Sequence, residues 1–305
     1  MMGMTTAIDV TDLRQSYGDF EAVRGITFDV RQGELFALLG TNGAGKTTTM
    51  EVLAGYSKPS GGSVRVLGLD PVKERKQLRP RMSIMLQEAG FLGDLTVAET
   101  IELWRGMAKD AGREPLTGNP IELVELTSKA KVRVKQLSGG QKRRLDLALA
   151  ILSLPEVLFL DEPTTGMDPE ARQRTWEIVR SLREAGTTIL LTTHYLEEAE
   201  RLADRLAIMH EGVIRIDGTV DEVVATSGDQ LSFRLPDRHE LLPAIEGQAP
   251  SIAAGRAAYK VYGSAHAAMR ELLDWADKYQ VDLERLEVRP GTLDDVFLRV
   301  AKEAK

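Results

Sequence analysis

The 305-residue chain contains no cysteine and only four histidines. The absence of cysteine excludes disulfide bonds and thiolate metal sites, and four scattered histidines leave little for a structural zinc site. Acidic residues outnumber basic ones, 46 against 39, so the chain lacks the positive balance from which general nucleic-acid binders gain affinity. With 43% hydrophobic and 28% charged residues, the composition is otherwise that of an ordinary globular protein.

The sequence also lacks a long hydrophobic run. Its most apolar stretch, residues 145–160, is interrupted by Ser153, Pro155 and Glu156, and it falls short of the roughly 18 apolar residues that a membrane-spanning helix needs. The first nine residues have neither the basic nor the apolar region of a secretion signal. We therefore expect a cytoplasmic protein, with any membrane-spanning part supplied by another chain.

A glycine-rich string follows a strand-like apolar run at residues 35–39. It consists of Gly40, Thr41, Asn42, Gly43, Ala44, Gly45, Lys46 and Thr47, with Thr48 next in the chain. Glycines in this arrangement let backbone N–H groups converge on phosphate at a helix N-terminus, and Lys46 adds a positive charge there. The string predicts binding of a nucleoside triphosphate, with the Thr47 hydroxyl as a ligand of Mg²⁺.

Two carboxylates, Asp161 and Glu162, end a second apolar run at residues 157–160. Ligands of open parallel sheets lie at the carboxyl ends of the strands. Asp161 is therefore suited to the Mg²⁺ shell, and Glu162 is suited to polarise a water that attacks the γ-phosphate.

Strand-like runs alternate with helical ones, which predicts an α/β fold with a mostly parallel sheet whose two faces are both covered. We expect a first domain at residues 1–227, with a helical subdomain at about 88–136 and a hairpin that turns at residues 211–212. A small α+β domain follows at 228–305. Its expected elements are strands at residues 231–235, 257–262 and 283–288 and helices at residues 239–245, 264–279 and 293–301.

Residues 137–141 read Leu-Ser-Gly-Gly-Gln and precede a helical pattern. Together with the phosphate loop and the paired carboxylates, they make residues 6–227 resemble the nucleotide-binding subunit of an ABC transporter. The resemblance implies a P-loop cassette with an antiparallel β subdomain, ATP as the nucleotide, and a signature sequence that contacts the γ-phosphate of ATP held by the opposite subunit. The signature residues are Ser138, Gly139, Gly140 and Gln141. Independently of the family, Ser138 suits the N-cap of the helix that follows, where it would help to form an anion site.

The resemblance assigns roles to four further residues. It implies that Gln87 contacts Mg²⁺ or the attacking water and that His194 senses the γ-phosphate beside the catalytic carboxylate. It also implies that Tyr17 stacks on adenine and that Asp168 belongs to a loop at the dimer interface. On their own, Gln87 reads as a surface residue, His194 as a structural histidine and Tyr17 as a strand aromatic. Residues 142–144, Lys-Arg-Arg, read as a solvated helix end that faces phosphate.

Hydrolysis in this family requires two cassettes, because each signature serves the nucleotide of the other subunit. The resemblance thus implies an ATPase that acts as a homodimer, with a heterodimer as the alternative. It works with separate transmembrane permease subunits at the inner face of the cell membrane. We expect the exposed pair Phe91 and Leu92, within residues 90–96, to contact that partner, with buried loop packing as the alternative.

Three further segments, residues 162–170, 193–199 and 289–297, resemble the ATPases of bacterial drug and antibiotic exporters of the daunorubicin-resistance type. This likeness implies a multidrug-efflux kind of exporter but does not name the cargo. The competing class is a soluble ABC ATPase that acts on nucleic acid or ribosomes. The C-terminal domain has no recognisable catalytic cluster, and we expect it to contribute dimer contacts.

Overall fold

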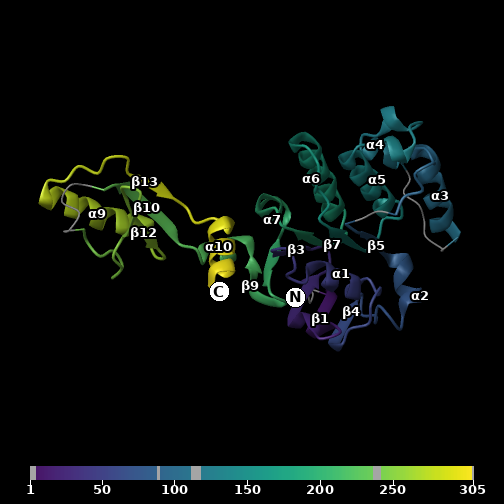
Figure 1. Ribbon diagram of the computed structural model, residues 1–305, viewed down its shortest axis with the longest axis horizontal. Coiled ribbons are helices and arrows are strands. Elements are labelled where there is room, and N and C mark those ends of the chain that lie inside the picture. Colours follow the sequence, from purple (N-terminus) through teal and green to yellow (C-terminus); the bar gives the residue numbers. More distant parts are fainter. Residues whose placement is uncertain (1–4, 88–89, 111–117, 236–241, 304–305) are drawn as a thin grey trace. The chain divides into compact units, whose positions relative to one another are not determined.

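The computed structural model describes residues 5–87, 90–110, 118–235 and 242–303. The chain forms two compact units, Met1–Asp217 and Gly218–Lys305 (Figure 1). This division falls before helix α8 (Val220–Ala225), whereas the sequence placed the domain boundary after it. Within the described segments, no helix is both long and apolar enough to cross a membrane.

A six-stranded sheet with the order β5-β6-β7-β3-β8-β9 forms the centre of the first unit. Its strands are β3 (Leu35–Gly40), β5 (Met82–Met85), β6 (Val157–Asp161), β7 (Thr188–Thr193), β8 (Arg205–His210) and β9 (Val213–Thr219). All pairings among the first five strands are parallel, which confirms the predicted sheet type. Between β8 and β9, Glu211 and Gly212 have φ angles of 47° and 78°, the positive values that a two-residue hairpin turn requires.

Apolar side chains fill both faces of this sheet, because successive residues of a strand point in opposite directions. Phe36 and Leu38 face a cluster shared with α1 (Lys46–Leu53) and a second, three-stranded antiparallel sheet. Leu35 faces the opposite cluster, which includes residues of α5, α6 and α7. Figure 1 shows α1 on one side of the sheet and α6 and α7 on the other. The remaining elements of the two layers are β1 (Thr6–Tyr17), β2 (Phe20–Arg31), β4 (Gly61–Val66), α2 (Arg75–Leu78), α5 (Gly139–Ile151), α6 (Pro169–Glu184), α7 (Leu196–Leu202) and the 3₁₀ helix Arg79–Arg81.

The helical insertion has its own apolar cluster. It contains α3 (Val97–Asp110), α4 (Pro120–Leu123) and the 3₁₀ helices Thr127–Lys129 and Val134–Gln136. The predicted start of α3 is confirmed by a capping box. The Thr96 N–H donates to Oε2 of Glu99 at 2.8 Å, and the Glu99 N–H donates to Oγ1 of Thr96 at 3.2 Å.

Helix α5 takes part in two clusters at once. Leu147 and Ile151 pack against the main sheet, whereas Leu145 and Leu149 pack within the insertion. Side chains three and four positions apart share a helix face, so two faces of α5 serve two different cores. The helix therefore ties the insertion to the sheet.

The second unit contains an antiparallel sheet with the order β11-β12-β10-β13. Its elements are α8, β10 (Asp229–Arg234), β11 (Ser251–Ala253), β12 (Arg256–Val261), α9 (Ala265–Tyr279), β13 (Glu287–Arg289) and α10 (Leu293–Glu303). Leu231, Tyr259, Leu272 and Trp275 lie in a cluster between the sheet and α9. The small α+β fold expected from the sequence is present.

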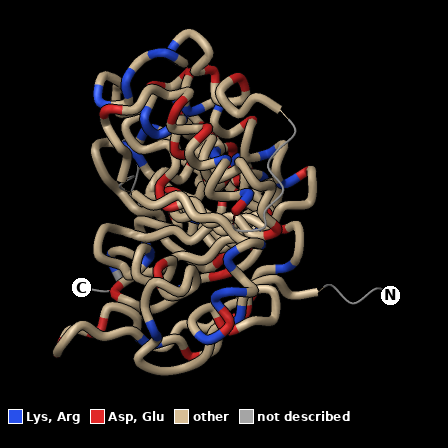
Figure 2. Tube along the Cα trace, turned by 90° about the vertical axis from the view of Figure 1, so that its right-hand side faces the viewer, with Lys and Arg blue, Asp and Glu red and all other residues tan. Residues whose placement is uncertain are grey.

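Two expectations for this unit fail in part. Residues 239–241 of the predicted helix lie outside the described residues, and residues 242–245 are not helical; Ile245 forms an isolated bridge with Gln248. The strand expected at residues 283–288 is reduced to its last two residues within β13, because Arg285 has a φ of 52° and interrupts the extended chain. Acidic and basic positions are interspersed along the trace (Figure 2).

Candidate active site

The phosphate loop connects β3 to α1. Gly45, the N-cap of α1, has a φ of 100°, and a Cβ there would lie 2.6 Å from the carbonyl oxygen of Ala22, so only glycine fits. Lys46 is buried, and its Nζ donates hydrogen bonds of 2.8 and 3.2 Å to the carbonyl oxygens of Gly40 and Thr41. Burial lowers the pKa of Lys46, while the neighbouring carboxylates act in the opposite direction. A cation is thus held at the open N-terminus of a helix.

The two carboxylates at the end of β6 have different surroundings. Asp161 is fully buried, and one of its oxygens, Oδ1, accepts a hydrogen bond from the Thr192 hydroxyl on β7. Its other oxygen, Oδ2, has no hydrogen-bond partner among the described residues. Glu162 has a φ of 50°, and its N–H donates to the Thr192 carbonyl oxygen at 3.0 Å. Both residues are therefore tied to Thr192 of β7.

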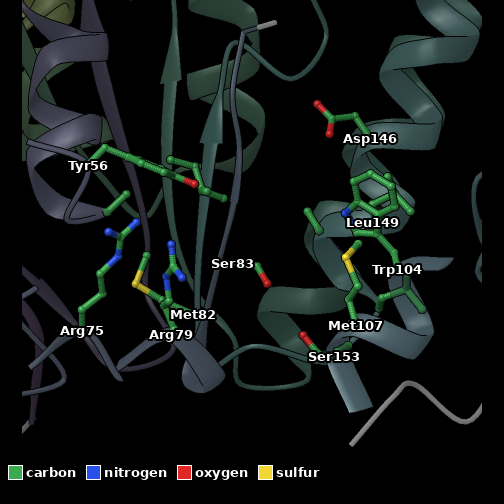
Figure 3. A pocket seen from close by; sticks show the side chains of 15 residues that line it. Tyr56, Arg75, Arg79, Met82, Ser83, Trp104, Met107, Asp146, Leu149 and Ser153 are labelled. Carbon is green, nitrogen blue, oxygen red and sulfur yellow. The ribbon is translucent and has the colours of Figure 1, made fainter. Parts of the chain in front are cut away.

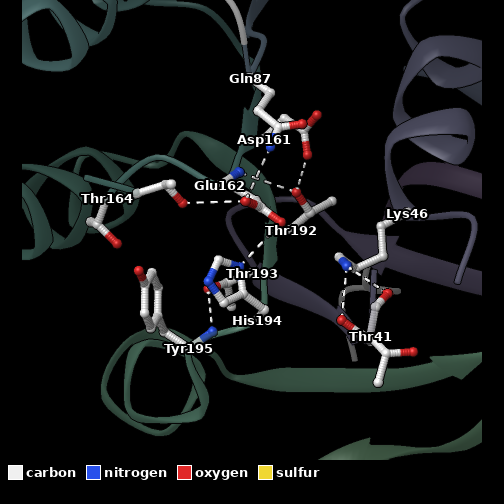
Figure 4. A network of polar contacts seen from close by, with 12 residues as sticks. Thr41, Lys46, Gln87, Asp161, Glu162, Thr164, Thr192, Thr193, His194 and Tyr195 are labelled. Carbon is white, nitrogen blue, oxygen red and sulfur yellow. Dashed lines mark hydrogen bonds and ion pairs between the residues drawn. The ribbon is translucent and has the colours of Figure 1, made fainter. Parts of the chain in front are cut away.

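Glu162 is the centre of a small polar network (Figure 4). Its Oε1 lies 3.2 Å from Nδ1 of His194, which directly follows β7. Its Oε2 accepts from the Thr165 hydroxyl at 3.2 Å and lies 3.5 Å from Nε2 of Gln87, which follows β5. The ring of Tyr195 packs on that of His194 with centroids 4.1 Å apart. Gln87, Glu162 and His194, the three residues predicted from the sequence to act in catalysis, are therefore neighbours.

Gln87, Glu162, Thr165 and His194 border a cavity of about 610 Å³ beside the phosphate loop. The residues that line it are Tyr17, Phe20, Ala22, Asn42, Gly43, Ala44, Gly45, Lys46, Thr47, Thr48, Gln87, Glu162, Thr165 and His194. Tyr17 and Phe20 are cross-strand partners at the tip of the β1–β2 hairpin and are 50% and 61% exposed. The sequence reading missed Phe20. An aromatic residue directly across a tight Gly18–Asp19 turn from Tyr17 is the signal that could have found it.

Among the described residues, the signature and Asp168 do not line this cavity. Ser138 is the N-cap of α5, as the sequence indicated, and the structure adds a capping box with Gln141. Asp168 caps α6 and accepts from the Ala171 N–H at 2.9 Å, which lowers the pKa of Asp168. The position of a Cβ on Gly140 would be 3.6 Å from the Gly166 carbonyl oxygen. The signature and the loop that ends at Asp168 thus adjoin each other. We call three of their exposed residues, Ser138, Gly139 and Asp168, the signature face.

The interpretation of residues 142–144 as a solvated helix end is wrong for two of the three. Arg143 is 8% exposed, and its guanidinium contacts backbone carbonyl oxygens at the ends of β5 and β6. Arg144 is largely buried and donates to the Val124 carbonyl oxygen at 3.2 Å. Helical spacing could have revealed Arg143, because it lies on the same face of α5 as Leu147 and Ile151.

A second hollow of about 500 Å³ lies elsewhere in the first unit (Figure 3). Tyr56, Arg75 and Arg79 border one side of it, and Trp104 and Met107 border the other. Its floor includes Ser83 of β5, and its wall includes Asp146 and Leu149 of α5. We call this hollow the insertion groove.

The exposed pair expected at Phe91 and Leu92 is not formed. Leu92 is 55% exposed, but Phe91 is half-buried and packs against the apolar cluster of the insertion. Phe91 is therefore engaged within the chain, which agrees with the alternative of loop packing for this residue.

A parallel sheet, a glycine-rich loop at a helix N-terminus with a buried lysine, and paired carboxylates at the end of another strand of the same sheet define a P-loop nucleoside triphosphatase. The model of the family "ABC transporter" matches residues 23–165, and that of an ABC-transporter-like C-terminal domain matches residues 230–292. The chain belongs to the ABC transporter family, as an ATP-binding and ATP-hydrolysing subunit of the exporter type.

Individual relatives support this assignment over nearly the whole chain. The chain is 40% identical over 303 residues to a Nod factor export ATP-binding protein I of Paraburkholderia xenovorans, with 96% of each protein covered. It is 41% identical over 244 residues to the daunorubicin resistance ATP-binding protein DrrA3 of Streptomyces coeruleorubidus, covering 79% of this chain and 77% of that protein. These relatives give no support to the alternative of an ATPase that acts on nucleic acid.

Solved structures of ATP-binding subunits share the fold. One ATP-binding subunit of an ABC transporter superposes with a TM-score of 0.64 at 29% identity, over 72% of this chain and 93% of that one. CbiO1 of Clostridium perfringens, part of the transporter complex cbiONQ, superposes with a TM-score of 0.62 at 27% identity, over 72% of this chain and 91% of that one. The predicted cassette fold is confirmed.

Proposed function

We propose that two copies of this chain close around two Mg²⁺–ATP molecules, hydrolyse them, and thereby drive export through separate membrane subunits. The observation that carries the dimer is the separation of two groups of residues in one chain. The cavity holds the phosphate loop and Glu162, whereas the signature face lies apart from it with exposed hydrogen-bonding groups. A second copy would bring its signature face to the cavity of the first, so each copy would complete the other's site.

The oxygen donors that line the cavity, together with Asp161, which is buried and does not line it, fit Mg²⁺. Asp161 has a buried carboxylate oxygen without a hydrogen-bond partner, and Thr47 and Gln87 offer a hydroxyl and an amide oxygen nearby in the fold. Mg²⁺ prefers oxygen ligands and commonly takes one or two carboxylates together with phosphate oxygens. Bound there, the ion would neutralise charge on the β- and γ-phosphates.

Glu162 is the proposed general base for the attacking water. Its Oε1 contacts the His194 imidazole at 3.2 Å, which leaves the histidine positioned to orient the carboxylate and to contact the γ-phosphate. Lys46 would stabilise the phosphate charge, and the backbone N–H groups at residues 43–48 would cradle the phosphates. Tyr17 would stack on adenine, with its hydroxyl 3.4 Å from Oε2 of Glu51.

The nature of the relatives supports a role in export. The relatives are named for Nod factor export and daunorubicin resistance, so this chain would serve an exporter whose cargo passes through the membrane subunits. The chain would then lie in the cytoplasm at the inner face of the cell membrane, held there by those subunits.

The insertion groove is the proposed contact for a cytoplasmic segment of a membrane subunit. Ser83 lies on β5, which leads to Gln87, and Leu149 lies on α5, which starts at the signature. An occupant of the groove would touch both elements and so sense nucleotide binding. Tyr56 and Met107 are 54% and 48% exposed, which suits an apolar helix face, and Arg75 and Arg79 suit a carboxylate at its edge.

The C-terminal unit would add contacts between the two copies. It has its own apolar core, so it can support a surface without help from the cassette. Removal of residues 228–305 should therefore weaken self-association with ATP, measured by mass in solution. Unchanged association of the shortened chain would remove this role from the unit.

The test of the proposed function is the mass in solution of the Glu162→Gln variant with and without ATP and Mg²⁺. Loss of the base should trap the ATP-bound closed state, so we expect ATP to double the mass and the hydrolysis rate to fall by a factor on the order of 100 or more. A Ser138→Ala substitution in the same background should reduce the doubling. A hydrolysis rate near that of the unsubstituted chain would exclude Glu162 as the base, and a persistent monomer would exclude closure of two copies without another protein.

A further inference from the structure

Arg143 is a buried cation whose partners lie at the catalytic centre. Its Nη2 donates to the carbonyl oxygens of Asp161 and Glu162, the latter at 2.9 Å. Its Nη1 donates to the carbonyl oxygens of Leu86 and Gln87, the latter at 3.2 Å. One planar guanidinium therefore joins the ends of β5 and β6, which an ammonium group with its compact point charge could not do with the same geometry.

The same side chain belongs to the signature helix. Arg143 is five positions after Ser138, the N-cap of α5, so the two residues are about 7–8 Å apart along the helix axis. Packing of α5 against two cores holds the helix as one rigid piece. A shift of Ser138 would therefore be transmitted to Arg143.

The charge of Arg143 is balanced locally. Oδ2 of Asp146 lies 3.4 Å from Nη1, and both side chains are largely buried. Loss of the Arg143 guanidinium would leave the four carbonyl groups and the Asp146 carboxylate without compensation. The backbone at Gln87 and Glu162 is thus supported by a single residue of α5 that does not itself line the cavity.

We propose that Arg143 is a positioning residue that couples the signature helix of a chain to the placement of Gln87 and Glu162 in that same chain. Because the signature serves the nucleotide of the other copy, this link connects the two ATP sites of a dimer. The inference rests on the proposed function. It predicts that nucleotide engagement at one site improves the alignment of the base at the other, which produces positive cooperativity in ATP.

The test uses full-length variants with substitutions at neighbouring positions. Arg143→Gln removes the fork but keeps a polar group, and Arg143→Lys keeps the charge but loses the two-pronged geometry. The control is Arg144→Gln, the next residue of α5, which is also largely buried but donates to Val124 in the insertion and not to β5 or β6. The readouts are kcat, KM and the Hill coefficient for ATP, with equilibrium ATP binding and thermal unfolding of each variant.

We expect Arg143→Gln to lower kcat by a factor on the order of 10–100, because a misplacement of about 1 Å at a base can have such an effect. KM and ATP binding should stay within about twofold of the unsubstituted chain, since the phosphate loop is untouched, and the Hill coefficient should approach one. Arg143→Lys should show the same pattern while it unfolds near the original temperature. Arg144→Gln should keep both kcat and the Hill coefficient.

Several outcomes would overturn the coupling role. They are an unchanged kcat and Hill coefficient in both Arg143 variants, an equal loss in Arg144→Gln, or a loss that follows only from weaker ATP binding. If Arg143→Gln does not fold, Arg143→Lys decides the question by the same criteria. Failure of the proposed function can be distinguished from failure of this coupling role. The proposed function fails if Glu162→Gln hydrolyses ATP at an unchanged rate, and that measurement does not depend on Arg143.

Discussion

Individual residues in this chain divide into those whose role follows from a motif and those whose role follows from burial. The proposed roles of Lys46, Asp161 and Glu162 could be predicted from spacing, since a phosphate loop and a strand-end carboxylate pair leave a local pattern. Arg143 has no such pattern of its own, because its four carbonyl partners come from two strands distant in the sequence. Helical spacing with Leu147 and Ile151 indicates that Arg143 is buried, but the identity of its partners depends on where tertiary packing places the ends of β5 and β6.

Asp146 offers a prediction at this scale. Burial raises the pKa of Asp146 to about 6, although the nearby Arg143 charge acts to lower it. The ionised form therefore costs stability above pH 6, and this cost disappears as the pH falls through 6 toward the unfolded value near 3.9. We expect Asp146→Asn to raise the free energy of unfolding at pH 7.5 by up to about 3 kcal/mol, with a smaller gain at pH 5.

The measurement is urea unfolding of both proteins at pH 5, 6 and 7.5. Asp217→Asn, at an exposed position of β9, serves as the control and should show no comparable change. A stability difference for Asp146→Asn that is the same at every pH would contradict the assigned cause.

At the scale of elements, the buried parallel strands β3, β5, β6 and β7 could be predicted because their apolar runs are continuous, and the starts of α3 and α5 because capping residues precede them. The long strands β1 and β2 were not predicted residue by residue. The C-terminal unit was less predictable. Arg285 adopts a positive φ in the middle of the strand predicted at residues 283–288, and β11 consists of three exposed residues that become a strand only by pairing with β12. Neither feature is encoded by local periodicity.

The junction between α8 and α10 gives the prediction at this scale. A Cβ on Gly291 would lie 1.9 Å from Oγ of Ser227 and 2.7 Å from the Gly228 carbonyl oxygen. We expect Gly291→Ala to lower the free energy of unfolding of the second unit by roughly 1–3 kcal/mol, because the Gly228 carbonyl group beside the added Cβ can move away only if the backbone shifts. Chemical denaturation followed by far-UV circular dichroism would measure this change.

The matched control is the same substitution at Gly106, an exposed position of α3 with no atom within 4 Å of the added Cβ. There alanine should stabilise the first unit by about 0.5–1 kcal/mol, because it restricts the unfolded chain and suits a helix. Equal effects of both substitutions would argue against the close approach at Gly291.

On the scale of the whole molecule, the division into two units with separate cores predicts two unfolding transitions. ADP with Mg²⁺ would bind the phosphate loop but lacks the γ-phosphate that the signature face would contact, so it should act on one unit without closing a dimer. At 100 times its dissociation constant, the nucleotide should stabilise the first unit by about 2.7 kcal/mol and leave the second unchanged.

Differential scanning calorimetry of the full-length chain would measure this effect. Two peaks of which one moves with ADP would agree with the expectation. A single peak that moves as a whole would mean that the two units unfold together.

The three tryptophans are distributed one to a core. Trp104 packs in the insertion, Trp176 packs against the main sheet, and Trp275 lies in the core of the second unit. The chain therefore carries a native optical reporter for the insertion, for one face of the main sheet and for the second unit, but none in the cluster that α1 shares with the three-stranded sheet. With two tryptophans replaced by phenylalanine at a time, the emission of the third would follow one region alone. Because the sequence has no cysteine, a single introduced thiol could carry an energy acceptor at a chosen site without competing labels.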